Sequence, residues 1–246
     1  MLKDHYDVIR KKKDDLWWFR GRRELFSSLL RRNMKGLVEN GLDAGCGPMT
    51  NESLYGGLAE RWIALDHSME SFRAAPHSPD VKQVIGGLDR SPIRKESADL
   101  ILLLDVLEHT DDDRGVIGEL ESCLKKGGLI LISVPAFKCL WSRHDEQAGH
   151  RRRYRSGDLI KLCEENGLKV LDRHYFNASL FLPIYIARKI LKMLPAGRKV
   201  IESDLSPGFA DPFLRLVLSI ERWISFNLFR MPFGTSFVLL ARKNDE

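Results

Sequence analysis

The segment Leu42–Gly47 constrains the fold of this chain more than any other. It reads Leu-Asp-Ala-Gly-Cys-Gly, so an apolar residue and an acid are followed by two glycines at Gly-x-Gly spacing. Such a segment is typical of a first strand that turns tightly beneath a nucleotide-like ligand and enters a helix. Glycine suits the turn because a side chain would block the approach of a ligand to the backbone. Thr50 stands where a third glycine would complete the dinucleotide fingerprint, which argues against a nicotinamide cofactor. An ordinary structural turn is the alternative interpretation.

Segments typical of strands alternate with segments typical of helices along the chain. The expected strands are one that ends at 42, then 61–66, 81–85, 98–104, 129–134, 168–175 and 234–242. The expected helices are 16–34, 51–60, 113–124 (ended by glycines at 127–128) and 156–166. This alternation predicts an α/β fold: a doubly wound, mostly parallel, seven-stranded Rossmann-like sheet. Ligands bind such sheets beyond the carboxyl ends of the strands.

We expect a single domain over residues 1–246, with an N-terminal helical lid at 1–35 and a helical insertion at 176–233 before the last strand. The insertion is far longer than the usual connection of about 4–6 residues, so it must carry its own structure. Its segments 180–194 and 213–230 predict strongly apolar amphipathic helices. A lid over the acceptor, a contact with a membrane surface, and a cap packed on the sheet or on a second subunit are the alternatives. The oligomeric state stays open.

Composition and net charge indicate which partners and which compartment to expect for this protein. The net charge of +5 and the pI near 9.0 weakly favour anionic partners. The four cysteines form no Cys-x-x-Cys pair, so the sequence predicts no metal site and indicates a reducing compartment. No apolar run reaches the roughly 18 residues that span a bilayer, and the N-terminus has no signal-peptide core. We expect a cytoplasmic protein, with peripheral contact to the inner face of the membrane as a further option.

Two more acidic segments follow expected strands. Asp66 ends the second strand, 23 residues after Asp43, close to the spacing of roughly 20 at which an acid reaches the ribose of a bound nucleoside. The segment Asp105–His109 follows the apolar run 98–104 directly, which places an acid and an imidazole at the ligand edge. Helix capping and a satisfied histidine are the alternative interpretation of the second segment.

Together, four segments resemble the class I S-adenosylmethionine-dependent methyltransferases. They are Leu42–Gly47, Ala64–Asp66, Asp105–His109 and Leu124–Leu129, and they look most like the ubiquinone/menaquinone-methyltransferase-like branch. The resemblance implies S-adenosylmethionine as the cofactor. It assigns cofactor contacts to Asp43, Ala44, Gly45, Cys46, Gly47, Asp66, His67, Leu88, Asp89 and Asp105. The family often has an acid where Gly87 stands, so Asp89 is the candidate to replace it.

Three further segments resemble a narrower group of bacterial methyltransferases that are often associated with glycan or lipid assembly. They are Trp17–Arg23, Trp141–Tyr154 and Pro232–Ser236. The resemblance implies a methyltransferase whose acceptor is a small molecule or is linked to a lipid or glycan. Oxygen is the acceptor atom we expect.

Methyl transfer to a hydroxyl benefits from a base that removes its proton. The candidate bases, in order of preference, are His150, His144 and His109, because imidazole titrates near neutral pH. The residues expected to line the acceptor pocket are Trp141, Arg153 and Tyr154. If the acceptor is a carboxylate, no base is needed.

The basic run 151–155 also fits contact with nucleic acid, because arginine pairs with phosphate and an aromatic ring can stack on a base. A solvated turn is the simpler interpretation, and we do not favour nucleic acid as a partner. A non-catalytic S-adenosylmethionine-binding or nucleic-acid-binding protein of the same fold is the alternative function.

Overall fold

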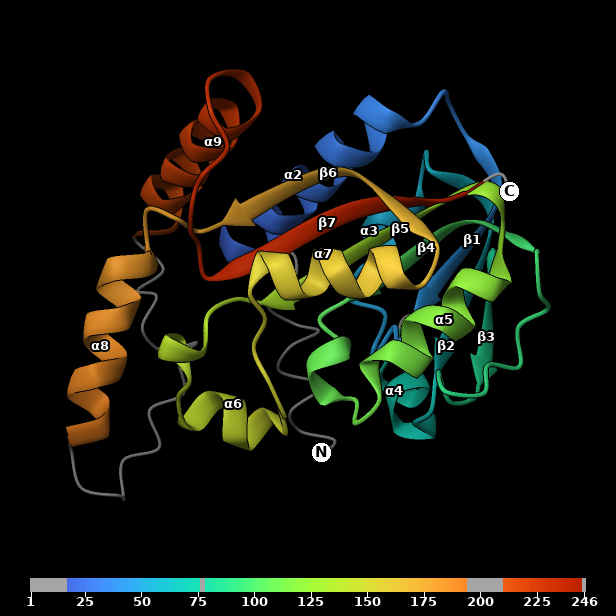
Figure 1. Cartoon of the computed structure of the whole chain (residues 1–246), viewed down its shortest axis with the longest axis horizontal. Coiled ribbons are helices and arrows are strands. Elements are labelled where there is room, and N and C mark those ends of the chain that lie inside the picture. The colour runs from blue at the N-terminus through green and yellow to red at the C-terminus, as the bar shows by residue number, and fades with distance from the viewer. Residues whose placement is uncertain (1–16, 76–77, 194–209, 245–246) are drawn as a thin grey trace.

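Seven strands form one sheet in the computed structural model, which describes residues 17–75, 78–193 and 210–244 (Figure 1). The strands are β1 Val38–Ala44, β2 Ala59–Asp66, β3 Val81–Ile85, β4 Ala98–Leu104, β5 Leu124–Pro135, β6 Leu168–Phe176 and β7 Ser236–Lys243. Their order is β3-β2-β1-β4-β5-β7-β6. All neighbours pair in parallel except β7, which is antiparallel to both β5 and β6. The predicted mostly parallel, seven-stranded fold is confirmed.

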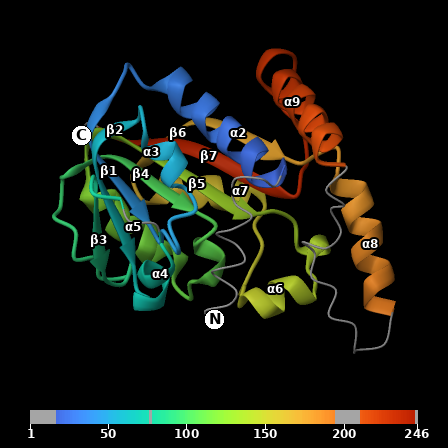
Figure 2. The ribbon, with the colours of Figure 1, turned by 180° about the vertical axis from the view of Figure 1, so that it is seen from behind.

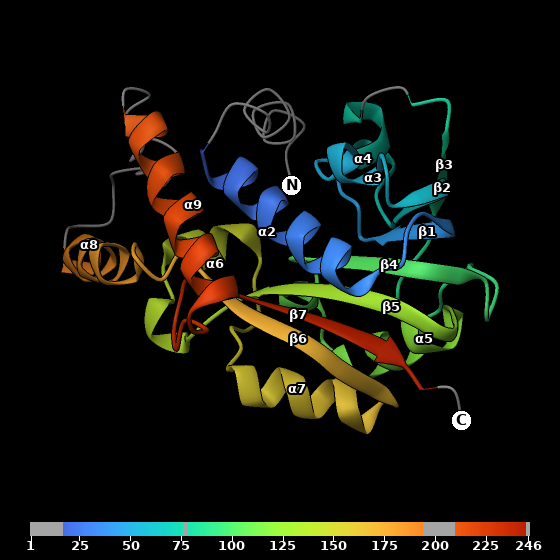
Figure 3. The same ribbon diagram turned by 90° about the horizontal axis from the view of Figure 1, so that it is seen from above.

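Helices cover both faces of this sheet (Figures 2 and 3). They are α2 Trp17–Asn33, α3 Glu52–Tyr55, α4 Met69–Ala74, α5 Asp113–Cys123, α6 Arg143–Ala148, α7 Ser156–Glu165, α8 Phe181–Met193 and α9 Asp211–Asn227, with 3-10 turns η1 Leu107–His109 and η2 Lys138–Leu140. Seen from above, α2 lies on one face, and α5 and α7 lie on the other (Figure 3). The chain reverses its direction of winding between β1 and β4, so a ligand site is expected beyond the ends of these strands.

The position of β4 in the middle of the sheet explains why its sequence is apolar from Leu100 to Leu104. Leu100 and Leu102 belong to the core beneath α2, whereas Ile101 and Leu103 belong to the core beneath α5 and α7. Successive side chains of a strand point to opposite faces, so a strand covered on both faces needs apolar residues at every position. Each core is continuous across the sheet up to the edge where the parallel strands end.

Two local predictions are wrong. The helix expected at 51–60 is only Glu52–Tyr55, because Gly56 and Gly57 follow it, Gly57 adopts φ +80°, and β2 begins at Ala59. The glycines expected to stop the next helix lie inside β5. There the pairing with β4 shifts between Ala98 and Leu100, and Gly127 adopts φ +71°. These glycines therefore lie at an irregularity in the pairing of β5 with β4 and do not end a helix.

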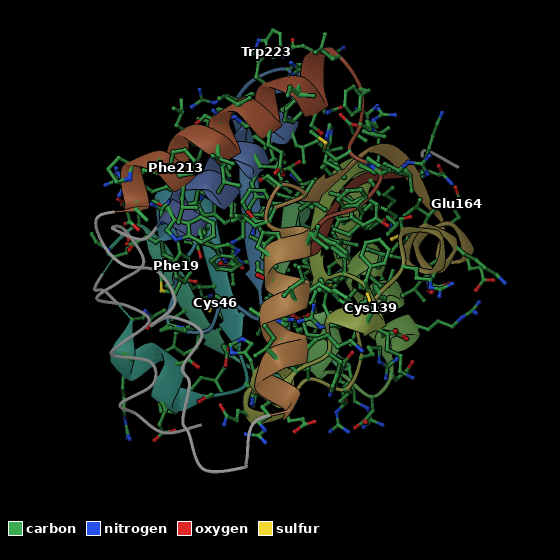
Figure 4. All side chains as sticks on the ribbon, turned by 90° about the vertical axis from the view of Figure 1, so that its left-hand side faces the viewer. Phe19, Cys46, Cys139, Glu164, Phe213 and Trp223 are labelled. Carbon is green, nitrogen blue, oxygen red and sulfur yellow. The ribbon has the colours of Figure 1, made fainter. Side chains whose placement is uncertain are left out.

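The connection between β6 and β7 carries α8 and α9, which flank the end of the sheet at the left of Figure 1. The inner face of α9 carries buried polar residues beside Leu218. The Glu221 carboxylate accepts hydrogen bonds from the backbone N–H groups of Ala178 (3.0 Å) and Ser179 (2.9 Å), and the Ser225 hydroxyl lies 2.7 Å from His174 Nδ1. Its outer face exposes Phe213, Leu216, Ile220 and Trp223 (Figure 4). Apolar residues therefore lie on both faces of α9, and the buried face combines Leu218 with the polar Glu221 and Ser225. No helix within the described ranges is long and apolar enough to cross a membrane.

Candidate active site

The turn after β1 is built from two glycines in left-handed conformations. Gly45 has φ +77° and Gly47 has φ +52°. A Cβ at Gly45 would lie 2.7 Å from Val106 Cγ2, so the turn packs directly on the segment after β4. A Cβ at Gly47 would meet no heavy atom within 4 Å. One glycine is thus required by close packing, and the other borders open space.

Asp66 is buried at the end of β2 and holds this turn. Its Oδ2 accepts a hydrogen bond from the Gly47 N–H (2.9 Å), while Oδ1 accepts from the Ser68 N–H (2.8 Å) and the Ser71 hydroxyl (3.2 Å). Two carboxylate oxygens offer about four acceptor sites, so capacity remains for a ligand hydroxyl. His67, expected beside the cofactor, is 85% exposed at its side chain, and its Nδ1 lies 3.6 Å from Asp66 Oδ1.

Asp43 lies beneath the same turn and is almost fully buried. Its Oδ2 accepts a hydrogen bond from the Tyr55 hydroxyl (2.6 Å), whereas its Oδ1 has no partner among the described residues. Burial raises the pKa of Asp43 to about 6, against the opposing effect of the Tyr55 hydrogen bond. Burial also raises the pKa of the Cys46 thiol, which keeps it protonated and unreactive. Ala44 is buried beside them.

Asp105 directly follows β4 and adopts a left-handed conformation with φ +57°. Its Oδ1 accepts a hydrogen bond from the Ser133 hydroxyl (2.9 Å), and its Oδ2 forms an ion pair with Arg22 of α2. The Arg22 guanidinium lies 4.4 Å from the Trp18 ring centroid, and its Nη2 is 3.4 Å from Asn51 Oδ1. Sequence reasoning missed Arg22 as a site residue, although the aromatic and basic segment 17–23 was a signal that α2 takes part in the site.

In the loop after β3, the side chain of Asp89 lies against Gly87. Asp89 Oδ1 lies 2.6 Å from the position that a Cβ of Gly87 would occupy. The carboxylate of Asp89 therefore takes the space of a side chain at Gly87. Leu88 between them is partly buried against the core.

On the side expected to hold the acceptor, Asp145 of α6 is fully buried and has four polar partners, one of which is Arg188, with its Nη1 3.9 Å from Oδ2. Its Oδ1 lies 2.9 Å from His150 Nδ1 and accepts from Arg153 Nε (2.8 Å), and its Oδ2 accepts from the Ser142 N–H (2.8 Å). Burial alone would raise the pKa of Asp145, but the His150 hydrogen bond and the Arg153 charge hold it below its usual value. Because a carboxylate only accepts, the proton of a neutral His150 lies on Nδ1, and Nε2 carries the lone pair.

The three predicted histidines lie close together around His150. Its ring centroid is 4.8 Å from that of His109 and 6.2 Å from that of His144. His150 Nε2 also lies 4.0 Å from Oε1 of Glu108, a residue that the sequence reasoning passed over. Glu108 is buried, and its Oε2 has no partner among the described residues. Burial, with the nearby Asp105 charge, raises the pKa of Glu108 well above its usual value.

The expected pocket residues differ in exposure. Trp141 is partly exposed and donates from Nε1 to Glu146 Oε1 (3.3 Å). Arg153 is buried and also donates to the Ala136 carbonyl (3.1 Å). The Tyr154 ring is buried, and its hydroxyl donates to Asp113 Oδ2 (2.9 Å). Trp141 is the member of this set with surface to offer an acceptor.

The neighbouring basic residues are bound by the chain itself. Arg152 donates to Asp113 Oδ2 (2.9 Å) and to the Asp111 carbonyl (2.8 Å). Arg151 donates to the His109 carbonyl (3.1 Å). These internal contacts support the interpretation of the run as a structured turn over that of a phosphate-binding surface.

Curated proteins that are similar to this chain are named as methyltransferases. A protein of Mycolicibacterium smegmatis named as a probable S-adenosylmethionine-dependent methyltransferase is 28% identical over 164 residues, which are 65% of this chain and 62% of that protein. A similarly named protein of Mycobacterium tuberculosis is 27% identical over 120 residues, or 48% of this chain and 43% of that protein. The chain thus spans about two fifths to three fifths of the curated relatives it matches.

Solved structures share the fold at low identity. The methyltransferase in complex with the Haloferax volcanii Trm112 methyltransferase activator has a TM-score of 0.64 at 16% identity, covering 99% of this chain and 96% of that chain. An S-adenosylmethionine-dependent methyltransferase from Archaeoglobus fulgidus has a TM-score of 0.56 at 18% identity, covering 96% and 99%. A described [4+2]-cyclase, SpnF, also shares the fold, with a TM-score of 0.59 at 16% identity over 90% and 80%.

The family model described as a methyltransferase domain matches residues 18–173. That range extends from the second residue of α2 into β6 and includes the residues of the site described above. The chain therefore belongs to the methyltransferase domain family, within the class I S-adenosylmethionine-dependent methyltransferases.

Proposed function

We propose that this protein is an S-adenosylmethionine-dependent methyltransferase that methylates an oxygen of a small or lipid- or glycan-linked acceptor. The observation that carries the proposal is the edge formed by the Gly45–Gly47 turn, Asp66 and Asp105, where the family model also matches. Asp105–His109 further supports a place near the ubiquinone/menaquinone-methyltransferase-like branch.

The residues at this edge fit the cofactor. The backbone at Gly47 borders open space, and Asp43 Oδ1 is a buried acceptor without a described partner. Asp43 and the glycine turn would hold the methionine part, and Asp66 would hold the ribose hydroxyls. Asp89, which fills the space at Gly87, would contact the adenine side with Leu88. When bound, S-adenosylmethionine supplies an electrophilic methyl group on a sulfonium leaving group.

His150 is the base we propose for an acceptor hydroxyl. Asp145 fixes its Nδ1 proton, so Nε2 is free to accept the hydroxyl proton as the oxygen forms its bond to the methyl carbon. This is the logic of a base oriented by a buried carboxylate. Trp141 would supply an apolar wall, and α2 with Arg22 would act as a lid that excludes water.

Calorimetry with S-adenosylmethionine, S-adenosylhomocysteine and NAD tests the cofactor assignment. We expect binding of the first two and none of NAD. Transfer of labelled methyl to polyprenyl-linked sugars, quinone precursors and small acids then tests the reaction. His150→Ala should lower turnover about 100-fold or more on a hydroxyl acceptor with cofactor affinity unchanged. Cofactor binding without transfer to any acceptor class would favour the non-catalytic alternative, for which the cyclase neighbour is a precedent of fold only.

We also propose that α8 and α9 contact an anionic membrane surface next to the acceptor pocket. The exposed apolar residues of α8 are Leu182, Ile186 and Ile190, and those of α9 are Phe213, Leu216, Ile220 and Trp223. Lys189 is exposed on α8, and Arg230 follows α9. Arg188 of α8 donates to the Leu140 carbonyl of η2, which links α8 to the segment just before Trp141, a residue proposed to line the acceptor pocket. Apolar stripes with basic neighbours are typical of helices that lie on membranes.

Co-sedimentation with vesicles of phosphatidylglycerol and phosphatidylcholine tests this contact. The pair Phe213→Ser and Trp223→Ser should weaken binding about 10–100-fold, since both rings would leave the lipid interface. Leu37→Ser is the matched control, because Leu37 is an exposed apolar residue at the start of β1. Equal binding of all variants, or no binding of the unmodified protein, would exclude the membrane proposal.

A further inference from the structure

Three side chains beyond β4 form a cluster with the chemistry of a metal site. Single ligand atoms of Glu108, His109 and His150 all lie within 4.8 Å of one another. Glu108 and His109 come from η1, directly after β4, and His150 comes from the loop after α6. We propose that these three side chains bind a divalent transition-metal ion, for which two imidazoles and one carboxylate suit zinc best. The sequence prediction of no metal site considered cysteine motifs and did not weigh this trio.

The buried carboxylate of Glu108 is the first independent observation. Glu108 is 1% exposed, and its Oε2 has no hydrogen-bond partner among the described residues. Burial of this carboxyl group without a partner makes its ionised form costly, and ionised carboxylates in such places are normally paired or coordinate a metal. The two neighbouring carboxylates already have cations: Asp105 pairs with Arg22, and Asp145 pairs with Arg153. Glu108 is thus the acid of this region that still lacks a direct cationic partner.

The second observation is the way His150 is held. Its Nδ1 lies 2.9 Å from the buried Asp145 carboxylate, and its Nε2 lies 4.0 Å from Glu108 Oε1. A carboxylate that fixes one imidazole nitrogen while the other faces the ion is the usual support of metal-bound histidine. Asp145 is itself held by Arg153 and the Ser142 N–H, so this support is rigid.

The spacing of the ligand atoms is compatible with a metal after a small contraction. Bonds to zinc of about 2.0–2.2 Å place nitrogen and oxygen ligands about 3.3 Å apart in a tetrahedron. The present separations reach up to 4.8 Å, so side-chain rotations that close the cluster by about 1–1.5 Å would complete it. His109, whose ring stands edge-on to that of His150, is partly exposed rather than locked in the core.

Three protein ligands leave a position open for a substrate oxygen. A metal there would bind an acceptor hydroxyl and lower its pKa, so that the oxygen would lose its proton to solvent before it attacks the methyl carbon. Because Nε2 of His150 would then bind the ion, this route is an alternative to base catalysis by His150 and does not add to it. The substrate class would then be acceptors with a hydroxyl, or with two adjacent oxygens, that can coordinate a divalent ion. This role rests on the proposed function, whereas binding of the ion itself does not.

The test measures metal binding without cofactor or acceptor. The full chain is stripped with chelator, dialysed against zinc chloride, and analysed for bound metal, with affinity taken from titration calorimetry. We expect about one zinc per chain. His109→Ala and Glu108→Gln should each weaken binding at least 100-fold. Cobalt in place of zinc should give visible absorption bands that both variants lose.

His67→Ala is the matched control, because His67 also lies beside a carboxylate, that of Asp66, but does not belong to the cluster of three ligands. It should bind zinc as the unmodified protein does. Zinc binding that is absent, or that survives both His109→Ala and Glu108→Gln, would overturn the proposal. Calorimetry with S-adenosylmethionine on the stripped protein keeps the two questions apart: cofactor binding without metal binding refutes the metal site alone, and metal binding without methyl transfer refutes the proposed function alone.

Discussion

At the edge where the parallel strands end, the acidic side chains of the two halves are held by different kinds of contact. Around β1 and β2, Asp43 and Asp66 receive hydrogen bonds from residues at most 19 positions away in the chain. Around β4 and β5, Asp105 is paired with Arg22, 83 positions away, and Glu108 has an oxygen without a described partner. The first half is closed in the sense that local contacts hold it, although Asp43 Oδ1 also has no partner among the described residues. The second half is held by a contact with a distant segment, α2.

The glycine turn offers the strongest test of the closed half. In Gly45→Ala, the new Cβ would lie 2.7 Å from Val106 Cγ2 at φ +77°, so the turn must shift. We expect S-adenosylmethionine affinity to fall about 100-fold, which corresponds to about 2.7 kcal/mol. Calorimetry measures it. Gly57→Ala is the control, since Gly57 has φ +80° but no atom within 4 Å of an added Cβ. Equal loss in both variants would show that backbone strain, not packing on Val106, governs the site.

The buried Asp43 should make the stability of the closed half depend on pH. Its pKa rises from 3.8 when unfolded to about 6 in the fold, so the protonated carboxyl is favoured by folding. Its stabilising contribution is complete below pH 3.8 and is lost as pH rises through 6. The span amounts to about 3 kcal/mol. Urea unfolding of the unmodified protein and Asp43→Asn at pH 4 and pH 7 should show the difference between them change by about 2–3 kcal/mol.

Asp111→Asn is the control for that measurement, because the Asp111 carboxyl is 77% exposed. Its difference from the unmodified protein should stay nearly constant over the same pH range. A constant difference for Asp43→Asn as well would mean that Asp43 is hydrated in solution, and the contrast between the halves would weaken.

Arg22 connects the two halves, and its removal should separate them. Arg22→Ala leaves Asp105 without its cation and removes the contact with Trp18. The Asp105 side chain keeps 27% exposure, so we expect a loss of about 2 kcal/mol in unfolding free energy, below the range for fully buried pairs. Arg31→Ala on the exposed end of α2 should change it by less than about 0.5 kcal/mol. Similar losses of unfolding free energy for both variants would mean that the contacts of Arg22 with Asp105 and Trp18 do not stabilise the protein.

The contrast also explains what the sequence could predict. The Gly-x-Gly turn, Asp66 and the apolar run of β4 are local patterns, and they led to the correct sheet and to residues that the structure brings together at one edge. No local sequence pattern marked Glu108 as a site residue, because its role depends on His150, which folding brings beside it. The predicted helix at 51–60 failed because two glycines and the pairing of β2 with β1 outweighed local helix propensity.

The insertion shows the same limit. Helix periodicity located α8 and α9 closely, but not which face is inward. In α9 the inward face is set by Glu221, whose carboxylate holds the start of the insertion at Ala178 and Ser179, and by Ser225 against His174. A pattern of apolar and polar residues predicts that two faces exist. The polar partners on β6 and after it decide which of them is buried.

The smallest expected effect on stability comes from the exposed face of α9, and the buried face of the same helix provides the comparison. Trp223 is 58% exposed, so Trp223→Ser should change the unfolding free energy by no more than about 0.5 kcal/mol. Leu218, on the opposite face and 2% exposed, packs on Gly21 of α2, and Leu218→Ala should cost about 2–4 kcal/mol. Urea unfolding at two protein concentrations checks both. A large and concentration-dependent cost for Trp223→Ser would mean that a second copy of the chain covers this face in solution, since only association makes stability depend on concentration.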